Sequence, residues 1–187
     1  MQKVLFLFGE LNDDDIDWLI TVGQIEKVPP KTNLIRENAP LENLYLLLEG
    51  SVSVSITVVD HLREIAVLSS GEIFGELSFM DNRLPTASVN TIEDCLVVAI
   101  PRQKILDRLQ QNVGFAARFN RAIATFLAHR LRNTVRSLGQ DKDFVFNQSV
   151  VGEDTPDSMI ENFELATTRF DWILRRVKSH TAAEFLV

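Results

Sequence analysis

The stretch Phe74–Val89, FGELSFMDNRLPTASV, contains a glycine, a carboxylate, an arginine and hydroxyl groups close enough in sequence to form one binding site. Gly75 lets the backbone approach a ligand closely, because it has no Cβ to intrude. Glu76 beside it can accept charge-assisted hydrogen bonds, which are roughly twice as strong as neutral ones. Arg83 and the hydroxyl of Thr86 follow within the same stretch. We therefore consider it as a candidate phosphate-binding loop.

Groupings that would indicate an enzyme are absent from the sequence. The three histidines, His61, His129 and His180, lie far apart, and we interpret each as a surface residue. There is no Gly-x-Ser-x-Gly elbow, Walker A loop or His-Glu-x-x-His sequence, and the polar loop lacks a nucleophile–base pair. The run Asp13–Asp15 is explained by the N-terminus of a helix rather than by a metal site. The sequence predicts a non-enzymatic protein without a metal or a cofactor.

Composition and charge restrict the class of partner. The chain has 187 residues, of which 45% are hydrophobic and 24% charged, and its net charge is −7. This acidic balance argues against non-specific nucleic-acid binding, which relies on Lys and Arg. The single cysteine, Cys95, lies in the apolar run CLVVAI and is predicted to be buried. No apolar run approaches the roughly 20 residues that span a bilayer, and the N-terminal apolar run is too short for a secretion signal, so we expect a cytoplasmic protein.

The candidate loop lies within a region of short β-rich segments that extends from Gly23 to Pro101. Turn residues separate these segments, and their close spacing predicts a sandwich or a small barrel. In residues 51–58, SVSVSITV, valines and an isoleucine alternate with serines and a threonine, which predicts a half-exposed strand. The predicted strands fall at residues 24–28, 32–37, 44–50, 51–59, 64–68, 86–91 and 95–100.

Helices are predicted on both sides of this region. Residues 11–20 read as a helix that Asn12 or Asp13 can cap, and residues 101–109 as a second, short helix. A longer helix runs over residues 113–138 and carries an apolar stripe. It also holds five arginines and no acidic residue: Arg118, Arg121, Arg130, Arg132 and Arg136. A basic amphipathic helix can bind a membrane surface or an acidic partner, although a solvated face opposite the stripe is the interpretation that we favour.

The C-terminal part divides into a linker and one further helix. We expect a domain over residues 1–138, a linker over 139–155, and a helical extension over 156–187 with Thr155 as cap and Pro156 at its first position. The stripe of this helix is Met159, Phe163, Ala166, Phe170, Ile173 and Val177. From Asp141 onward there are nine acidic and five basic residues, a balance of −4. This segment does not look like a DNA-reading helix-turn-helix, which needs two adjacent helices and a basic face.

The motifs around the loop resemble those of the cyclic nucleotide-binding domain family, as in catabolite activators and the regulatory subunits of protein kinase A. The resemblance covers roughly residues 12 to 138 and includes the strand–Gly–strand segment LENLYLLLEGSVSV and the entry GEIF. The phosphate-binding cassette of the family is matched at Phe74, Gly75, Glu76, Leu77, Ser78, Ala87 and Val89.

The resemblance implies a mainly β fold with flanking helices. This fold is a double-stranded β-helix, a jelly-roll-like β-roll of about eight strands, with a short helix inside the cassette and helices at the C-terminus. It also implies that Glu76 accepts a hydrogen bond from the ribose 2′-hydroxyl, while the backbone of residues 75–78 and 86–87 holds the cyclic phosphate. A helix N-terminus suits that anion, because its free N–H groups and its dipole favour negative charge.

One residue departs from the family pattern. The cassette arginine that pairs with the phosphate falls on Pro85, which has neither charge nor backbone donor. The loss of a charge-assisted contact should weaken binding by about 1.5–3 kcal/mol, or roughly one to two decades of affinity. Arg83 is the obvious substitute, unless it is simply a solvated loop residue. In some members of the family, a threonine at the position of Thr86 accompanies a preference for cGMP. Those members also have the cassette arginine, which is missing here.

Our leading hypothesis is a regulatory protein that binds a cyclic nucleotide, cAMP or cGMP, or a related small anion. The first alternative is a nucleotide-blind module for protein–protein interaction, and a more distant one is a transcription regulator without a recognisable DNA-binding domain. In dimeric bacterial members the long helix pairs with its twin. The resemblance therefore makes four residues of helix 113–138 candidates for a homodimer seam, or else for packing on the β-roll: Phe119, Ile123, Phe126 and Leu127.

Overall fold

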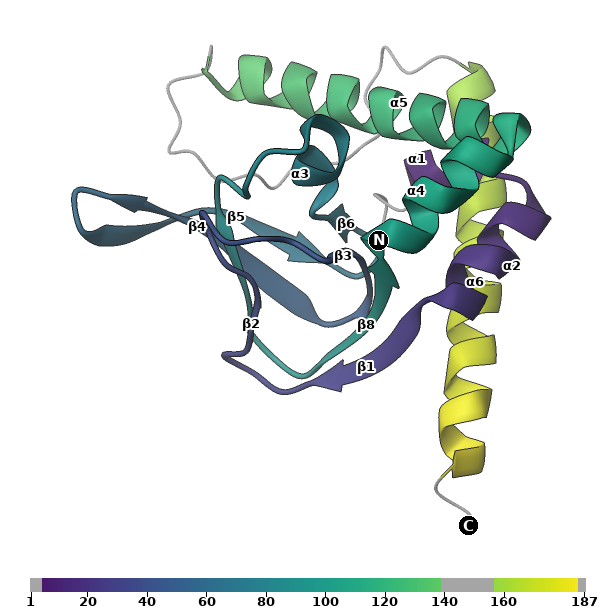
Figure 1. Cartoon of the computed structure of the whole chain (residues 1–187), viewed down its shortest axis with the longest axis horizontal. Helices are drawn as coiled ribbons and strands as arrows, with labels where there is room; N and C mark the ends of the chain where they lie inside the picture. Colours follow the sequence, from purple (N-terminus) through teal and green to yellow (C-terminus); the bar gives the residue numbers. More distant parts are fainter. Residues whose placement is uncertain (1–4, 139–156, 185–187) are drawn as a thin grey trace.

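The computed structural model describes residues 5–138 and 157–184. Its centre is a β-roll of two four-stranded antiparallel sheets, with helices gathered on one side (Figure 1). The first sheet has the order β1 (Gln24–Val28), β8 (Cys95–Pro101), β3 (Asn43–Glu49) and β6 (Ile73–Phe74). The second has the order β2 (Asn33–Ile35), β7 (Ser88–Thr91), β4 (Ser51–Val58) and β5 (His61–Ser69). The predicted β-roll is confirmed.

The central strands of the first sheet are buried on both faces, which explains their continuous apolar sequences. Along β3, Leu44, Leu46 and Leu48 enter the hydrophobic cluster beneath the helices. The alternate residues Tyr45 and Leu47 enter a second cluster inside the roll. Strand β8 divides its side chains between the same two clusters, and Cys95 is buried in the second, as predicted.

The strict alternation predicted for residues 51–58 holds only in the first half of β4. Val52 is fully buried, but the pairing of β4 with β5 shifts register between Val54 and Ser55. Such a bulge places two residues of one strand against one of its partner and changes the face that later side chains occupy. Ser55 is consequently buried, while Ile56 is only half-buried. The alternation of apolar and polar residues in β4 cannot reveal this register shift, because the shift depends on how β4 pairs with β5.

Helix α2 (Asp13–Val22) begins at a capping box, which confirms one of the two predicted caps. The Asn12 side chain accepts a hydrogen bond from the Asp15 N–H at 2.9 Å, and the Asp15 carboxylate accepts one from the Asn12 N–H at 3.3 Å. Helix α1 (Leu5–Glu10) precedes it, where the sequence suggested only an apolar lead-in. The cassette contains the short helix α3 (Glu76–Asp81) that the resemblance implied.

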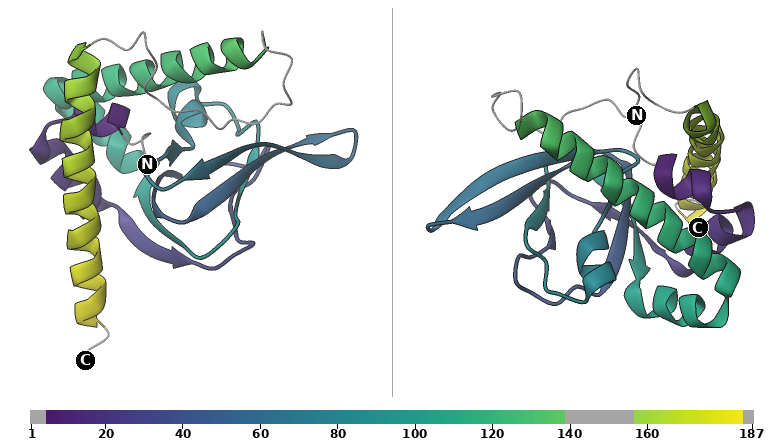
Figure 2. Two further views of the ribbon diagram at one scale, coloured as in Figure 1. Left: turned by 180° about the vertical axis from the view of Figure 1, so that it is seen from behind. Right: turned by 90° about the horizontal axis from the view of Figure 1, so that it is seen from above.

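Helices α4 (Arg102–Gln111) and α5 (Val113–Leu138) follow the roll, and α5 lies across it (Figure 2). The first part of the α5 stripe is buried in the core at Phe115, Phe119, Ile123 and Phe126. Further along the helix, Leu131 and Val135 are exposed by 64% and 59%. Most of the candidate seam residues therefore pack on the body of the protein.

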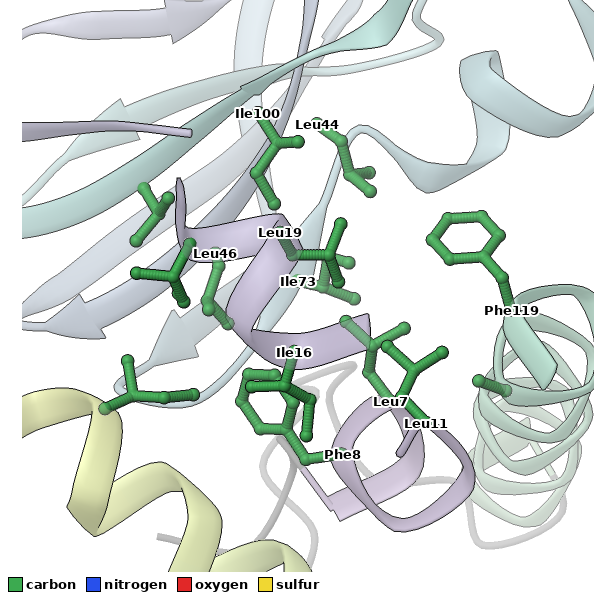
Figure 3. Close-up of a cluster of buried hydrophobic side chains, with 14 of the residues drawn as sticks. Leu7, Phe8, Leu11, Ile16, Leu19, Leu44, Leu46, Ile73, Ile100 and Phe119 are labelled. Carbon is green, nitrogen blue, oxygen red and sulfur yellow. The ribbon is translucent and has the colours of Figure 1, made fainter. Parts of the chain in front are cut away.

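Helix α6 (Asp157–Glu184) packs against α1. Its residues Ala166, Phe170, Ile173 and Val177 belong to the cluster that α5 and the first sheet share, and the ring of Phe170 stacks on that of Phe8 at 6.5 Å. Figure 3 shows Phe8 in this cluster, between the helices and the sheet.

The predicted linker, with its cap Thr155 and its Pro156, lies outside the described residues, and so do the side chains of Met159 and Phe163. No helix within residues 5–138 and 157–184 is long and apolar enough to cross a membrane.

Candidate ligand-binding site

The cassette begins where β6 passes into α3 through Gly75. This residue has φ +90° and ψ 1°, a left-handed conformation that L side chains adopt at a cost. A Cβ built on Gly75 would lie 3.0 Å from Leu41 Cδ2 and 3.3 Å from the Asn43 carbonyl oxygen. Glycine is therefore required at this position both for its backbone conformation and for the lack of space.

Glu76, the first residue of α3, is only 3% exposed. Its carboxylate accepts a hydrogen bond from Nη1 of Arg130, which reaches it from α5. Burial raises the pKa of Glu76, because it disfavours the charged form, while the charge of Arg130 and the Glu76 backbone N–H act in the opposite direction. The predicted ribose carboxylate is thus paired with a cation.

Arg130 is the residue of the candidate site that the sequence did not single out from the other arginines of its helix. It is 54 residues away from Glu76, its side chain is 29% exposed, and its guanidinium lies 5.2 Å from the centre of the Phe126 ring. This contact joins the candidate ligand site directly to α5. The only signal in the sequence was the row of arginines without acidic residues on that helix, for which the sequence favours a solvated face.

Two other arginines of α5 are also paired with other elements. Arg118 donates to both oxygens of Asp15, at 2.6 Å from Nε and 3.1 Å from Nη2, and this contact raises the pKa of Arg118. Arg121 lies 3.1 Å from the carboxylate of Glu10. The favoured interpretation of a solvated basic face holds for Arg121, whose side chain is 73% exposed, but is wrong for Arg118 and Arg130, which are 34% and 29% exposed and tie α5 to α2 and α3.

The remaining residues of the first cassette segment are mostly structural. The Phe74 ring stacks on Tyr45 with a 5.2 Å separation of ring centres and a 9° angle between planes. Ser78 is buried, whereas Leu77 is half exposed. At the C-terminal end of α3, Arg102 Nη2 donates to the side-chain oxygen of Asn82 at 2.9 Å, which places a cation at the negative end of this short helix.

Pro85 is buried, and its carbonyl accepts a hydrogen bond from the Asn38 N–H at 2.8 Å. Close by, the Glu37 N–H donates to the Ser88 hydroxyl at 3.0 Å. Between them Thr86 is exposed and Ala87 half-buried. The proline thus lies in a buried, hydrogen-bonded contact between the loop before β7 and the turn after β2.

Arg83 faces solvent, with a side chain that is 84% exposed. Its N–H donates to the Asp81 carboxylate at 3.1 Å, and its Nε lies 3.7 Å from the other carboxylate oxygen. The structure therefore brings Gly75, Glu76 and Arg130 together and leaves Arg83 on the surface. Among the described residues, no group of His, Cys, Asp and Glu side chains could hold a metal ion.

A β-roll with a short internal helix that begins at a glycine–glutamate pair is the arrangement that the resemblance of the cassette implied. Residues 25–112 match the sequence model of the cyclic nucleotide-binding domain family. This part of the chain belongs to that family, as the motifs had indicated.

Individual relatives agree with this assignment. Over 128 residues the chain is 30% identical to the cAMP-activated global transcriptional regulator CRP of Pasteurella multocida, a match that covers 67% of this chain and 59% of the regulator. Its structure is similar to that of the catabolite activator protein of Thermus thermophilus, with a TM-score of 0.60, 27% identity and coverage of 72% of this chain and 62% of that one.

The regulatory domain of Toxoplasma gondii PKA, crystallised with cAMP, is also similar. It gives a TM-score of 0.53 with 29% identity, and the match covers 56% of this chain and 41% of that one. The chain matches less than two thirds of the length of each of these proteins. These relatives are regulatory proteins by their names.

Proposed function

We propose that the protein is a non-enzymatic, cytoplasmic regulator whose β-roll binds a cyclic nucleotide, cAMP or cGMP, or a related small anion. The observation that carries this proposal is the contact between Glu76 and Arg130, which connects the cassette to α5. A carboxylate that is 3% exposed and paired with a cation from another element forms a pre-organised polar site rather than a solvated surface group.

In this proposal Glu76 accepts the ribose 2′-hydroxyl, and the backbone of residues 75–78 and 86–87 holds the cyclic phosphate. Arg83 assists only after it leaves Asp81. Because Pro85 supplies no charge, the cation nearest to Glu76 is Arg130. A ribose hydroxyl that binds Glu76 competes with Arg130 for the same carboxylate, and the released guanidinium can then turn to the phosphate.

Ligand binding would thereby act on α5. Helix α5 contacts α1, and α1 contacts α6, so a shift of α5 would reach α6 through packed side chains. The affinity of the free protein would be reduced by the free energy of the Glu76–Arg130 contact, since a ligand must replace that contact.

Calorimetric titration of the full chain with cAMP, cGMP and cyclic dinucleotides tests the proposal. We expect heat from at least one of them, and about tenfold or greater loss of affinity in Glu76→Gln, since a charge-assisted hydrogen bond contributes about 1.5–3 kcal/mol. Glu64→Gln, an exposed residue of β5, is the matched control and should bind normally. No heat with any ligand, together with an unchanged melting temperature, would refute ligand binding.

A nucleotide-blind interaction module is the second candidate, and the position of Pro85 favours it. A buried proline whose carbonyl is hydrogen-bonded to Asn38 stabilises the loop without contributing any charge. This candidate predicts that titration is negative while Glu76→Gln changes only stability.

We further propose a homodimer formed through the exposed end of α5, at Leu131 and Val135. Sedimentation equilibrium should show a dimer for the unchanged protein and a weaker one for Leu131→Lys. Leu62→Lys, at another exposed leucine, on β5, should leave the dimer intact. A monomer at all concentrations would exclude this interface.

A further inference from the structure

Helix α6 has a second apolar face besides the one that it buries. Ala166, Phe170 and Ile173 are at most 5% exposed. On another side of the helix, Leu165 and Trp172 remain 45% and 48% exposed. These two residues are seven positions apart and therefore lie on the same side, two turns from one another.

This second face forms one wall of a cleft with a volume of about 450 Å³ between α6 and α2. Helix α6 contributes Leu165, Thr168, Arg169 and Trp172, and α2 contributes Asp13, Asp14, Ile16 and Asp17. The volume lies within the roughly 300–1,000 Å³ of typical binding clefts. An exposed tryptophan and an exposed leucine therefore face three carboxylates across an open space.

The rim of the cleft carries negative charge. Arg169 does not offer its charge to the opening, because its guanidinium donates to the Phe8 and Leu11 carbonyl oxygens, at 2.6 and 2.8 Å, and to Asp13 at 2.8 Å. Asp14 is exposed and forms no ion pair within the described part of the chain.

Two of the lining residues, Trp172 and Asp17, already take part in an example of the chemistry that would suit the cleft. The guanidinium of Arg176 lies 5.0 Å from the centre of the Trp172 ring and also pairs with Asp17. A cation held between an indole face and an aspartate is a favourable arrangement, because the ring face carries negative potential. The same combination of indole and carboxylate is available on the open side, at Trp172 and Asp14.

We propose that this cleft is a docking site for a basic, amphipathic segment of a partner protein. One aliphatic or aromatic side chain of the segment packs on Leu165 and Trp172, while a lysine or arginine on its flank pairs with Asp14. Charge complementarity identifies the partner as basic, and the apolar wall requires an apolar anchor. The lining residues of this cleft do not include any residue of the cassette.

Selection of a random peptide library on the immobilised full chain tests this inference, with Trp172→Ala used to deplete peptides that bind elsewhere. We expect the remaining peptides to carry net positive charge and at least one large apolar residue. Their affinity should fall in Leu165→Ala, a change that the depletion step does not select for and that removes the other apolar residue of the α6 wall. It should also fall as salt is raised, because exposed charges are screened.

Two further variants keep the test decisive. Asp14→Lys places the opposite charge on an exposed residue and should weaken basic peptides, even if Trp172→Ala proves unstable. Leu62→Ala removes an exposed leucine from β5, outside the cleft, and should bind like the unchanged chain. Failure to recover any cleft-dependent peptide, recovery of acidic peptides, or equal binding to Asp14→Lys would overturn the inference.

Discussion

Removal of the Arg130 side chain should destabilise the protein in a pH-dependent way. In Arg130→Met the Glu76 carboxylate keeps its 3% exposure but loses its cation. Breaking a fully buried ion pair from one side costs about 3–5 kcal/mol. Arg130 is itself 29% exposed, so water can partly replace it, and we expect the lower cost of a charge-assisted hydrogen bond, about 1.5–3 kcal/mol.

The pH dependence follows from the direction of the pKa shift. Burial raises the pKa of Glu76, and Arg130 opposes this rise, so the pKa rises further in Arg130→Met. A carboxyl group with a raised pKa binds its proton more tightly in the folded protein than in the unfolded protein. The bound proton therefore stabilises the fold at low pH, and this stabilisation is lost as the pH rises through the folded pKa. The destabilisation should therefore be largest at neutral pH and should shrink as the pH falls through the raised folded pKa of Glu76 in the variant.

Urea unfolding followed by circular dichroism, near neutral and in mild acid, measures this effect. Glu76→Gln and the double variant complete a mutant cycle, whose coupling energy should be about 1.5–3 kcal/mol at neutral pH. Arg132→Met changes an exposed arginine of the same helix and should cost little. A pH-independent loss of stability in Arg130→Met, or a coupling energy below about 0.5 kcal/mol, would refute the reasoning.

Three further outcomes are expected from thermal unfolding. Gly75→Ala should cost about 1–3 kcal/mol, because φ is +90° and the new Cβ would crowd Leu41. Val59→Asn should raise the melting temperature by about 2–4 °C, since Val59 has φ +46°, is 86% exposed, and is followed by Asp60 at φ +64° in a turn that prefers asparagine. Phe170→Ala should cost about 3–5 kcal/mol, because its ring is buried against Phe8. A neutral result for any of these would contradict the packing or strain assigned to that residue.

Much of the fold could be predicted because its signals are local. The continuous apolar runs of β3 and β8 and the capping residues of α2 predict these elements from a few neighbouring residues. Helix α1 and strand β6 escaped prediction because they have six and two residues, too few to show a period. The bulge in β4 escaped for another reason: its register shift exists only in relation to β5.

The candidate site divides in the same way. Gly75 and Glu76 could be predicted because a glycine–carboxylate pair at the start of a helix is a local motif. The surface position of Arg83 could not be predicted from the sequence. It depends on whether the Arg83 side chain lies closer to Asp81 or to the ligand site, and the sequence does not give these distances. The partner of Glu76 could not be predicted either, because Arg130 is 54 residues away and only the packing of α5 on the roll brings the two together.

This long-range contact has a consequence for the affinity of the proposed ligand. A cassette arginine would be held by the loop itself, so its contribution would not depend on the helices. Arg130, by contrast, reaches Glu76 only while α5 stays packed through Phe119 and Ile123. If Arg130 supplies the charge that Pro85 lacks, and this gain exceeds the cost of giving up the Glu76–Arg130 contact, a substitution that loosens α5 without touching the cassette should weaken nucleotide binding. Ile123→Ala, measured by calorimetry at a temperature where the variant remains folded, should therefore lower affinity together with stability. Unchanged affinity in a destabilised Ile123→Ala would show that the phosphate is held by the cassette backbone alone.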